Sequence, residues 1–304
     1  MPTKPLESLL YRELSKADAK EVIDVASPLL QELVNYGTNL VARCMDSARG
    51  EENENLAVPM LYLHIIEMAD GVECLVAQSC AEPAWPLIRS QFEALLSINY
   101  ILEPGADYVQ RSLSWLAAYA HNRISYYELL DPSTHGGQRY QQALVADVVM
   151  QRVTSPPEVE VQAAIANMQA LLARPQFQAI EAEFQRRQTK KNRHVPWYAL
   201  FGGPQNLRML ARHLKQEARY DVLYGPWSAI AHAHDVSRFI GRTAQGESGL
   251  TRLRSPAAIR DVAKSAANYT MEATRLLLTK FRPGEKDSLA SWYVREVRER
   301  FLGL

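Results

Sequence analysis

The helical fold of this chain is decided by residues 87–102, which read LIRSQFEALLSINYIL. On a helix of 3.6 residues per turn, five polar positions of this stretch project onto a single arc of about 100°, and most other positions are apolar. The five positions are Arg89, Ser90, Glu93, Ser97 and Tyr100. Because polar groups that leave water need partners, the pattern predicts a largely buried helix whose one polar stripe faces other groups inside the molecule.

The rest of the chain also has a helical period, and no segment pair alternates like two strands. Short connections between helices favour antiparallel neighbours, so the sequence predicts an all-α multi-helix bundle, a single domain over 1–304. Residues 132–203 are richer in turns and charge and are interpreted as an inserted helical cap. The expected helices cover 6–14, 18–44, 58–78, 87–102, 107–130, 139–152, 158–172, 176–187, 204–215, 256–281 and 288–301.

Composition narrows the class of protein. Lys and Arg total 34 and Asp and Glu total 34 in 304 residues, so a surface that is basic throughout is excluded. The three cysteines include no pair at metal-ligand spacing, which is typical of reduced thiols. The sequence shows no basic-then-apolar leader and no apolar run near the roughly 20 residues that span a bilayer. We therefore expect a cytoplasmic protein that does not bind membranes.

A second stretch, residues 224–235, combines hydroxyls, imidazoles and a carboxylate in an apolar helical run, YGPWSAIAHAHD. At 100° per residue, Ser228, His232 and Asp235 lie within a quarter turn of one another on one helix face. His234 points to the opposite side, which carries Trp227. The shared face marks this stretch as the best candidate for a functional site.

Three stretches resemble a family of bacterial all-helical proteins that carries only a domain-of-unknown-function label. They are YGTNL at 36–40, PLIRSQFEA at 86–94, and YDVLY at 220–224 leading to Ser228 and His232. The resemblance spans residues 20 to 280, approximately. It implies an all-helical fold.

That family is in turn similar to the HEPN superfamily of helical bundles, many of which are ribonucleases in toxin–antitoxin or antiphage systems. Those enzymes use an arginine, then four to six residues, then a histidine. Upstream of His232 and His234, residues 225–229 read GPWSA and contain no arginine. The similarity implies a HEPN-like fold and, as an expectation, an antitoxin or operon partner. Long amphipathic helices favour a homodimer.

The first functional hypothesis is metal-independent RNA cleavage. His232 would act as the base or the acid, because imidazole titrates near neutral pH, and Arg89 would stabilise the charge on phosphate. Glu93 would orient either His232 or Arg89, and Ser228 or Tyr224 would bind phosphate. The residues expected to bind a ligand are Tyr100, Tyr224, His234 and Asp235.

Two alternatives stay open for the same residues. Arg89 and Glu93, four positions apart, can form an ion pair within a buried polar network that fixes the register of the bundle. The pocket can also belong to a non-catalytic module that senses a small ligand or a partner protein.

A metal site and a cofactor are not predicted. His64 and Glu67 lie three positions apart, but the chain contains no Glu-x-x-His, the pair that di-iron bundles place on two of their helices. No glycine-rich loop carries a phosphate-binding lysine.

The strongest charge block, residues 186–194, reads RRQTKKNRH. Its basic side chains could hold an RNA backbone, and the aromatic residues Trp197 and Tyr198 beyond it could stack on bases. A solvated linker is the alternative, because such runs are usually exposed. The residues expected to contact RNA are Arg186, Arg187, Lys190, Lys191 and Arg193.

Overall fold

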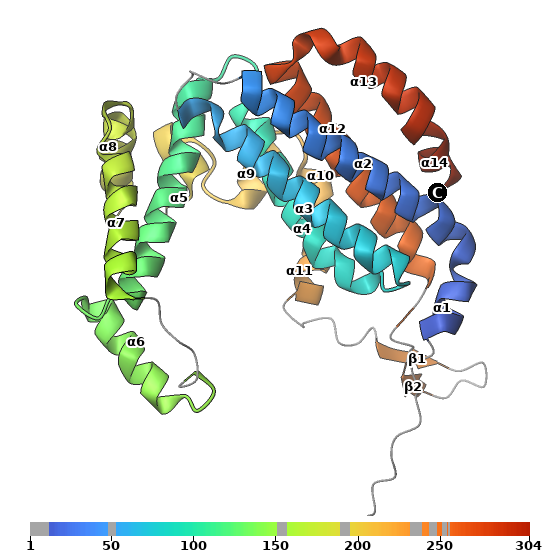
Figure 1. Cartoon of the computed structure of the whole chain (residues 1–304), viewed down its shortest axis with the longest axis horizontal. Helices are drawn as coiled ribbons and strands as arrows, with labels where there is room; N and C mark the ends of the chain where they lie inside the picture. Colours follow the sequence, from blue (N-terminus) through green and yellow to red (C-terminus); the bar gives the residue numbers. More distant parts are fainter. Residues whose placement is uncertain are drawn as a thin grey trace, which may run out of the picture. The chain divides into compact units, whose positions relative to one another are not determined.

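The computed structural model describes residues 12–47, 53–150, 157–188, 195–231, 239–242, 248–250, 254 and 256–304. Nearly all of this part of the chain is helical, so the prediction of an all-α fold is confirmed (Figure 1). The chain forms two compact units. The first unit combines Met1–Ala106 with Leu207–Leu304, and the second unit is Asp107–Asn206.

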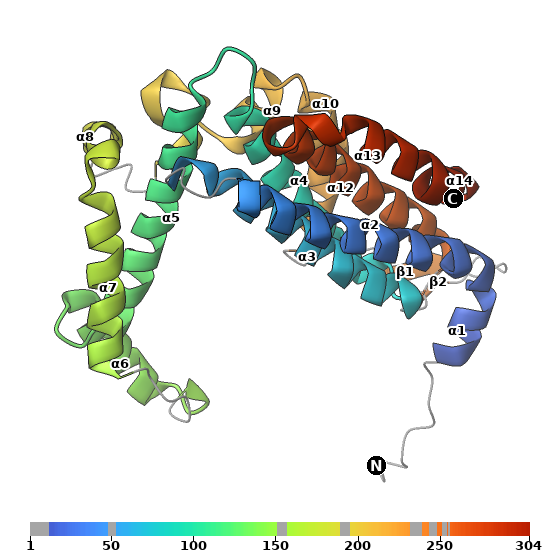
Figure 2. The same ribbon diagram turned by 45° about the horizontal axis from the view of Figure 1, so that its top comes forward.

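Four helices form the core of the first unit: α2 (Lys20–Ser47), α3 (Ala57–Ala77), α4 (Trp85–Ile101) and α12 (Ile259–Phe281). Each of α3 and α12 packs against the other three, and the bundle is visible from two directions in Figures 1 and 2. α4 is apolar over most of its circumference because it lies inside this bundle, as its sequence predicted. Burial of these apolar faces is the main term that stabilises the unit.

Small and polar side chains set the spacing of the core helices. Gly37 of α2 lies so close to α3 that a Cβ atom there would meet Ile66 Cδ1 at 2.3 Å. The hydroxyls of Tyr62 and Thr274 are 2.8 Å apart and connect α3 with α12. Gln91 of α4 donates from Nε2 to the backbone oxygen of Ile65 at 3.0 Å. These contacts fix the bundle register from inside.

Shorter elements surround this core. A single run of chain holds α10 (Glu217–Arg219), a π-helix over Tyr220–Tyr224 and α11 (Gly225–Ala231). The C-terminal run holds α13 (Lys286–Trp292), a second π-helix (Tyr293–Val297) and α14 (Arg298–Gly303). The first unit also contains α1 (Arg12–Asp18), α9 (Leu207–His213) and the 3-10 turns Asn53–Asn55, Glu82–Ala84, Pro256–Ala258 and Pro283–Glu285.

The second unit is built around α5 (Tyr108–Leu130). The helices α6 (His135–Ala146), α7 (Glu158–Leu172) and α8 (Gln178–Arg187) all pack against it. The unit also contains the 3-10 segments Pro175–Phe177 and Trp197–Gly202. Residues 132–203, expected as an inserted cap, lie within this unit, which begins earlier, at Asp107.

The differences from the sequence expectations include the bounds of α6, which ends at Ala146 and not at 152, and a short pair of strands. α6 starts at His135, not at 139, because Thr134 Oγ1 accepts a hydrogen bond from Gly137 N and caps the helix. A Cβ at Gly137 would lie 1.7 Å from the Asp131 carbonyl oxygen, so this glycine is required by the turn. A short antiparallel pair, β1 (Ile240–Arg242) and β2 (Ser248–Leu250), also exists where no strands were expected. Three residues per strand are too few to show an alternating pattern.

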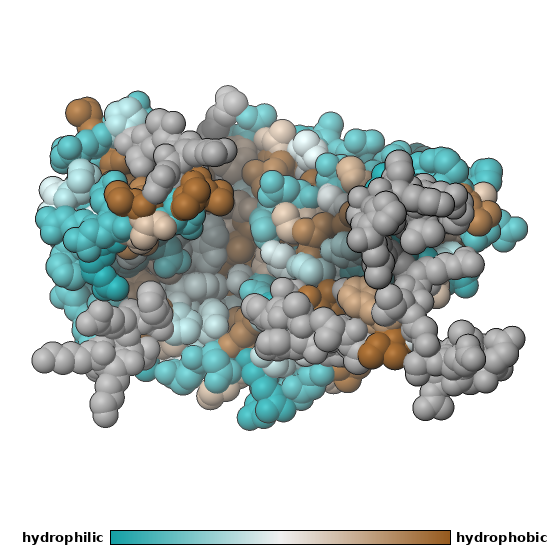
Figure 3. Space-filling view, turned by 90° about the horizontal axis from the view of Figure 1, so that it is seen from below, coloured by the Kyte–Doolittle hydropathy of each residue, from teal (hydrophilic) through white to brown (hydrophobic). Residues whose placement is uncertain are grey.

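The end of α6 presents an apolar surface. Val145, Val148 and Val149 are exposed by 73%, 72% and 75%. Figure 3 shows brown side chains standing on the surface around α6.

Among the residues that the structure describes, no helix is both long enough and apolar enough to cross a membrane.

Candidate functional site

The polar stripe of α4 opens toward solvent at its N-terminal half. The side chains of Arg89 and Glu93 are 21% and 41% exposed. Further along, Ser97 is buried and donates to the backbone oxygen of Glu93, and Tyr100 is buried as well. The accessible part of the stripe is therefore the turn from Arg89 to Glu93.

Arg89 is the centre of a polar cluster that joins α4 to the run Glu217–Ala231. Its Nε donates to Glu93 Oε1 at 3.0 Å and its Nη2 donates to the Tyr224 hydroxyl at 2.7 Å. Nη1 donates to Ser228 Oγ at 3.3 Å. The guanidinium carbon also lies 4.6 Å from the centroid of the Tyr224 ring, which is within cation–π range. We call Arg89, Glu93, Tyr224 and Ser228 the Arg89 cluster.

An aromatic layer supports this cluster. The ring of Tyr224 stacks on Tyr220 at 4.6 Å, and Trp227 stacks on Trp85 of α4 at 5.3 Å. Trp227 is only 4% exposed and its ring also contacts Tyr269 of α12. The stack of Trp227 on Trp85 holds α11 against α4, and the ring of Tyr224 lies 6.5 Å from the ring of Phe92 of α4. The positions of Tyr224 and Ser228 are therefore set by packing.

The electrostatics of the cluster keep both main donors protonated. Partial burial and the nearby Glu93 carboxylate raise the pKa of Tyr224 to about 12, although Arg89 acts in the opposite direction. Partial burial acts to lower the pKa of Arg89, but Tyr224 and Glu93 outweigh it and the pKa rises. Near neutral pH the cluster therefore offers a guanidinium cation and a neutral phenol, two hydrogen-bond donors suited to an anion.

The structure brings together four of the predicted site residues, namely those of the Arg89 cluster. Tyr100 lies three turns further along α4, where its ring meets the edge of the His213 ring at 5.6 Å. His232, His234 and Asp235 lie outside the described residues. The part of the proposed site that can be described is thus an arginine with one carboxylate and two hydroxyl partners.

Comparison with known proteins places this site within a family. Residues 56–247 match a family of unknown function, DUF5677. The chain belongs to the DUF5677 family. The matched range contains all four residues of the Arg89 cluster and the whole second unit. Searches of curated proteins and of solved structures gave no match.

In this DUF5677 protein, the first two residues of the basic run have a local role. Arg186 donates from Nε and Nη2 to the two oxygens of Glu183, each at 2.6 Å, and Arg187 donates to Oε1 at 3.1 Å. The same oxygen accepts from the backbone nitrogen of Phe201 at 3.0 Å. The hydrogen bonds from Arg186, with those from Arg187 and Phe201, lower the pKa of Glu183 to about 2 although burial opposes them. Both arginines thus stabilise the second unit, and Lys190, Lys191 and Arg193 lie outside the described residues.

The sequence did not predict the contact between His64 of α3 and Ser90 of α4. His64 Nε2 and Ser90 Oγ are 2.7 Å apart, and His64 Nδ1 lies 3.9 Å from Glu67 Oε2. The sequence showed the spacing of His64 and Glu67 but not their contact with α4, which depends on how α3 and α4 pack. Among the described residues, no group of three or more His, Cys, Asp or Glu side chains is placed to hold a metal ion.

Proposed function

We propose that this chain is a HEPN-like, metal-independent endoribonuclease of the bacterial defence or toxin type, and that the Arg89 cluster binds the scissile phosphate. The observation that supports it is the convergence of a partly exposed guanidinium with two hydroxyls, Tyr224 and Ser228, on one small surface. Guanidinium and hydroxyl donors are the groups that proteins use for phosphate oxygens.

The chemistry needs three roles. A base removes the proton of a ribose 2′-hydroxyl, whose oxygen attacks phosphorus, and an acid protonates the 5′-oxygen as its bond to phosphorus breaks. Arg89 would neutralise the charge that develops on the phosphoryl oxygens. Tyr224 and Ser228 would donate to the same oxygens, and Glu93 would orient the guanidinium through Nε. His232, four positions after Ser228 in the sequence, is the proposed acid or base.

The partners follow from this assignment. RNA would be the substrate, with Lys190, Lys191 and Arg193 as its additional backbone contacts. Arg186 would also contact the RNA backbone, because its side chain is exposed. A toxin of this type implies an antitoxin encoded beside it, and we propose a homodimer as the active form. RNA affinity that rests on such contacts falls steeply with added salt, so an affinity independent of salt would contradict the RNA-binding role.

A second candidate is a non-catalytic module that senses a ligand or a partner. The observation that favours it is the set of partners that Arg89 already has within the protein. In that case the cluster holds α4 and α11 together and does no chemistry.

Cleavage of single-stranded RNA by the purified chain in EDTA separates the two candidates. The wild type should cleave. His232→Ala should lower the rate by about 10²–10⁴-fold, the typical contribution of a positioned acid or base. Arg89→Ala should lower it by about 10²–10³-fold. Arg260→Ala, an exposed arginine near the start of α12, is the control and should cleave like the wild type.

Thermal melting of the same variants supplies the second readout. A His232→Ala protein that melts like the wild type but has lost cleavage supports the ribonuclease. An inactive wild type, or a His232→Ala variant that cleaves normally, would overturn the ribonuclease and leave the sensing module.

A further inference from the structure

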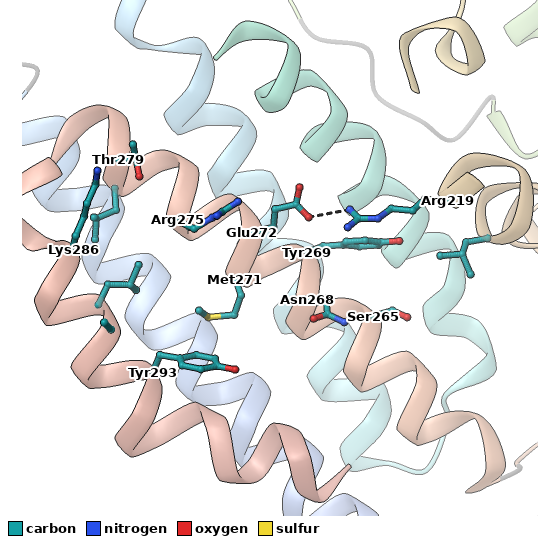
Figure 4. Close-up of a pocket in the computed structure, with 14 residues that line it drawn as sticks. Arg219, Ser265, Asn268, Tyr269, Met271, Glu272, Arg275, Thr279, Lys286 and Tyr293 are labelled. Atoms are coloured by element: carbon teal, nitrogen blue, oxygen red, sulfur yellow. Dashed lines mark hydrogen bonds and ion pairs between the residues drawn. The ribbon is translucent and has the colours of Figure 1, made fainter. Parts of the chain in front are cut away.

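A cleft of about 1010 Å³ opens in the first unit on the side of α12 that faces α13. Figure 4 shows its walls, which are α12, the C-terminal run with α13, and the run that begins with α10. Small-molecule sites in proteins have volumes of roughly 300–1,000 Å³, so this cleft is large enough for a ligand of ordinary metabolite size. Its polar lining residues on α12 are Ser265, Asn268, Glu272, Arg275 and Thr279.

Positive charge prevails in this cleft. Arg219 and Glu272 neutralise each other, with Nη1 of the arginine 2.9 Å from Oε2 of the glutamate. Arg275 and Lys286 are exposed and form no ion pair or hydrogen bond with any residue that the structure describes. Two unpaired cations therefore line the cleft, and a ligand with about two negative charges would match them.

Hydrogen-bonding groups stand beside these cations. In Figure 4 the Lys286 ammonium and the Thr279 hydroxyl lie at the same end of the cleft, and Arg275 lies one turn of α12 away from Thr279. A phosphate monoester carries nearly two charges at neutral pH and several strong acceptor oxygens. A single carboxylate would leave one of the two cations without a partner. The charge count therefore favours phosphate.

The other part of the lining is apolar. Met271 and Leu278 contribute from α12, and Leu289, Ala290 and the ring of Tyr293 contribute from the C-terminal run. Leu278 and Leu289 are buried. A purely ionic ligand would gain nothing from this wall, whereas an apolar or aromatic body would be removed from water against it.

We propose that the cleft binds a small ligand in which a phosphate group is joined to an apolar or aromatic body. Arg275 and Lys286 hold the phosphate. The apolar side of the cleft, which includes Met271 and Tyr293, holds the body. The same chemistry occurs in nucleotides and in alkyl phosphates derived from lipids.

Isothermal titration of the full chain tests this site. The probes are AMP, octyl phosphate and inorganic phosphate. At least one of the two organic probes should bind saturably and more tightly than inorganic phosphate. Arg275→Ala and Lys286→Ala should each weaken that binding about tenfold or more, because a charge-assisted contact is lost. Arg260→Ala, on the same helix but outside the cleft, should bind like the wild type.

The pattern of probes identifies the source of the ligand. Binding of AMP alone indicates a nucleotide, and binding of octyl phosphate alone indicates a lipid-derived ligand. Arg89→Ala should leave the titration unchanged, since the cleft is separate from the Arg89 cluster. Binding that is lost in Arg89→Ala and kept in Arg275→Ala would overturn the cleft assignment without affecting the proposed ribonuclease.

Two further results would overturn the proposal. The first is the lack of saturable binding for both organic probes up to about 5 mM, a concentration at which even millimolar affinities are visible. The second is unchanged affinity in both Arg275→Ala and Lys286→Ala. Because both side chains are exposed, we expect these variants to fold, and circular dichroism melting checks that they do.

Discussion

At the scale of single residues, Arg89 explains why a helix inside the bundle has a polar stripe. The sequence predicted its pairing with Glu93 from the spacing of four. It also predicted Ser228 as a facing group. Tyr100 shares the stripe in projection, but eleven residues along a helix amount to about 16 Å, so it does not join the cluster. Projection onto a helix face predicts direction and says nothing about distance along the axis.

Arg89→Lys should destabilise the protein. An ammonium on a flexible stem cannot reproduce the planar fork that reaches Glu93, Tyr224 and Ser228. We expect a loss of about 1–3 kcal/mol in the free energy of unfolding, the range for hydrogen bonds with a charged partner. Urea denaturation measures it, with Arg260→Lys as the control. Equal stability of the two variants would show that the three contacts contribute nothing to folding.

Glu183→Gln should destabilise the protein at pH 7 and have less effect in acid. The pKa of Glu183 is lowered from 4.5 to about 2 in the folded protein. The carboxylate therefore stabilises the fold fully above pH 4.5, and this contribution disappears as the pH falls from there toward 2. Urea denaturation at pH 7 should show a difference of about 2 kcal/mol. At pH 3 the difference between the variant and the wild type should be smaller. A difference that stays constant between the two pH values would contradict the ionic role.

The basic run shows the limit of a charge pattern. Five basic residues within 186–194 predicted an RNA contact. The pattern could not reveal that Glu183, one turn earlier on α8, binds the first two arginines and also accepts a hydrogen bond from the backbone nitrogen of Phe201. Arg186 and Arg187, which the charge pattern predicted to contact RNA, form ion pairs with Glu183 inside the second unit.

At the scale of elements, most helices were predicted because their apolar positions recur with a period of 3.6. The helix expected at 158–172 has those bounds in the structure. The π-helix at Tyr220–Tyr224 was not predictable, because a single wide turn has no period of its own. This turn precedes α11 and ends at Tyr224, so it sets the position at which the phenol reaches Arg89. The contact of Tyr224 with Arg89 was therefore not predictable from the sequence.

Gly37→Ala tests the close approach of α2 and α3. A methyl group at this position would lie 2.3 Å from Ile66 Cδ1 and 2.7 Å from the Tyr62 hydroxyl. The helices must move apart or the side chains must leave their rotamers, so we expect a loss of about 1–3 kcal/mol. Gly303→Ala is the control, because its methyl group would meet only Val25 Cγ1 at 3.8 Å. Thermal melting measures both, and a Gly37→Ala protein as stable as Gly303→Ala would show that the packing can relax.

At the scale of the whole molecule, the chain divides where α5 begins. The sequence placed the insertion at 132–203 because turns and charges are concentrated there. α5 looked like another bundle helix, yet its buried residues Leu113, Leu116, Ala117 and Ala120 belong to the second unit. Periodicity shows that a helix has an apolar face but does not show which helices cover it. The partner of α5 was therefore not predictable from α5 alone.

The function proposed for the whole molecule depends on the Arg89 cluster acting on a phosphate of RNA without a metal. The ends of the RNA fragments made by the full chain in EDTA report on this chemistry. Attack by the 2′-hydroxyl leaves a 2′,3′-cyclic phosphate on one fragment and a 5′-hydroxyl on the other. We expect these ends from the wild type and about 10²–10³-fold slower formation of the same fragments by Arg89→Ala. Fragments with 5′-phosphate ends, formed only when Mg²⁺ is added and formed equally by Arg89→Ala, would contradict the proposal.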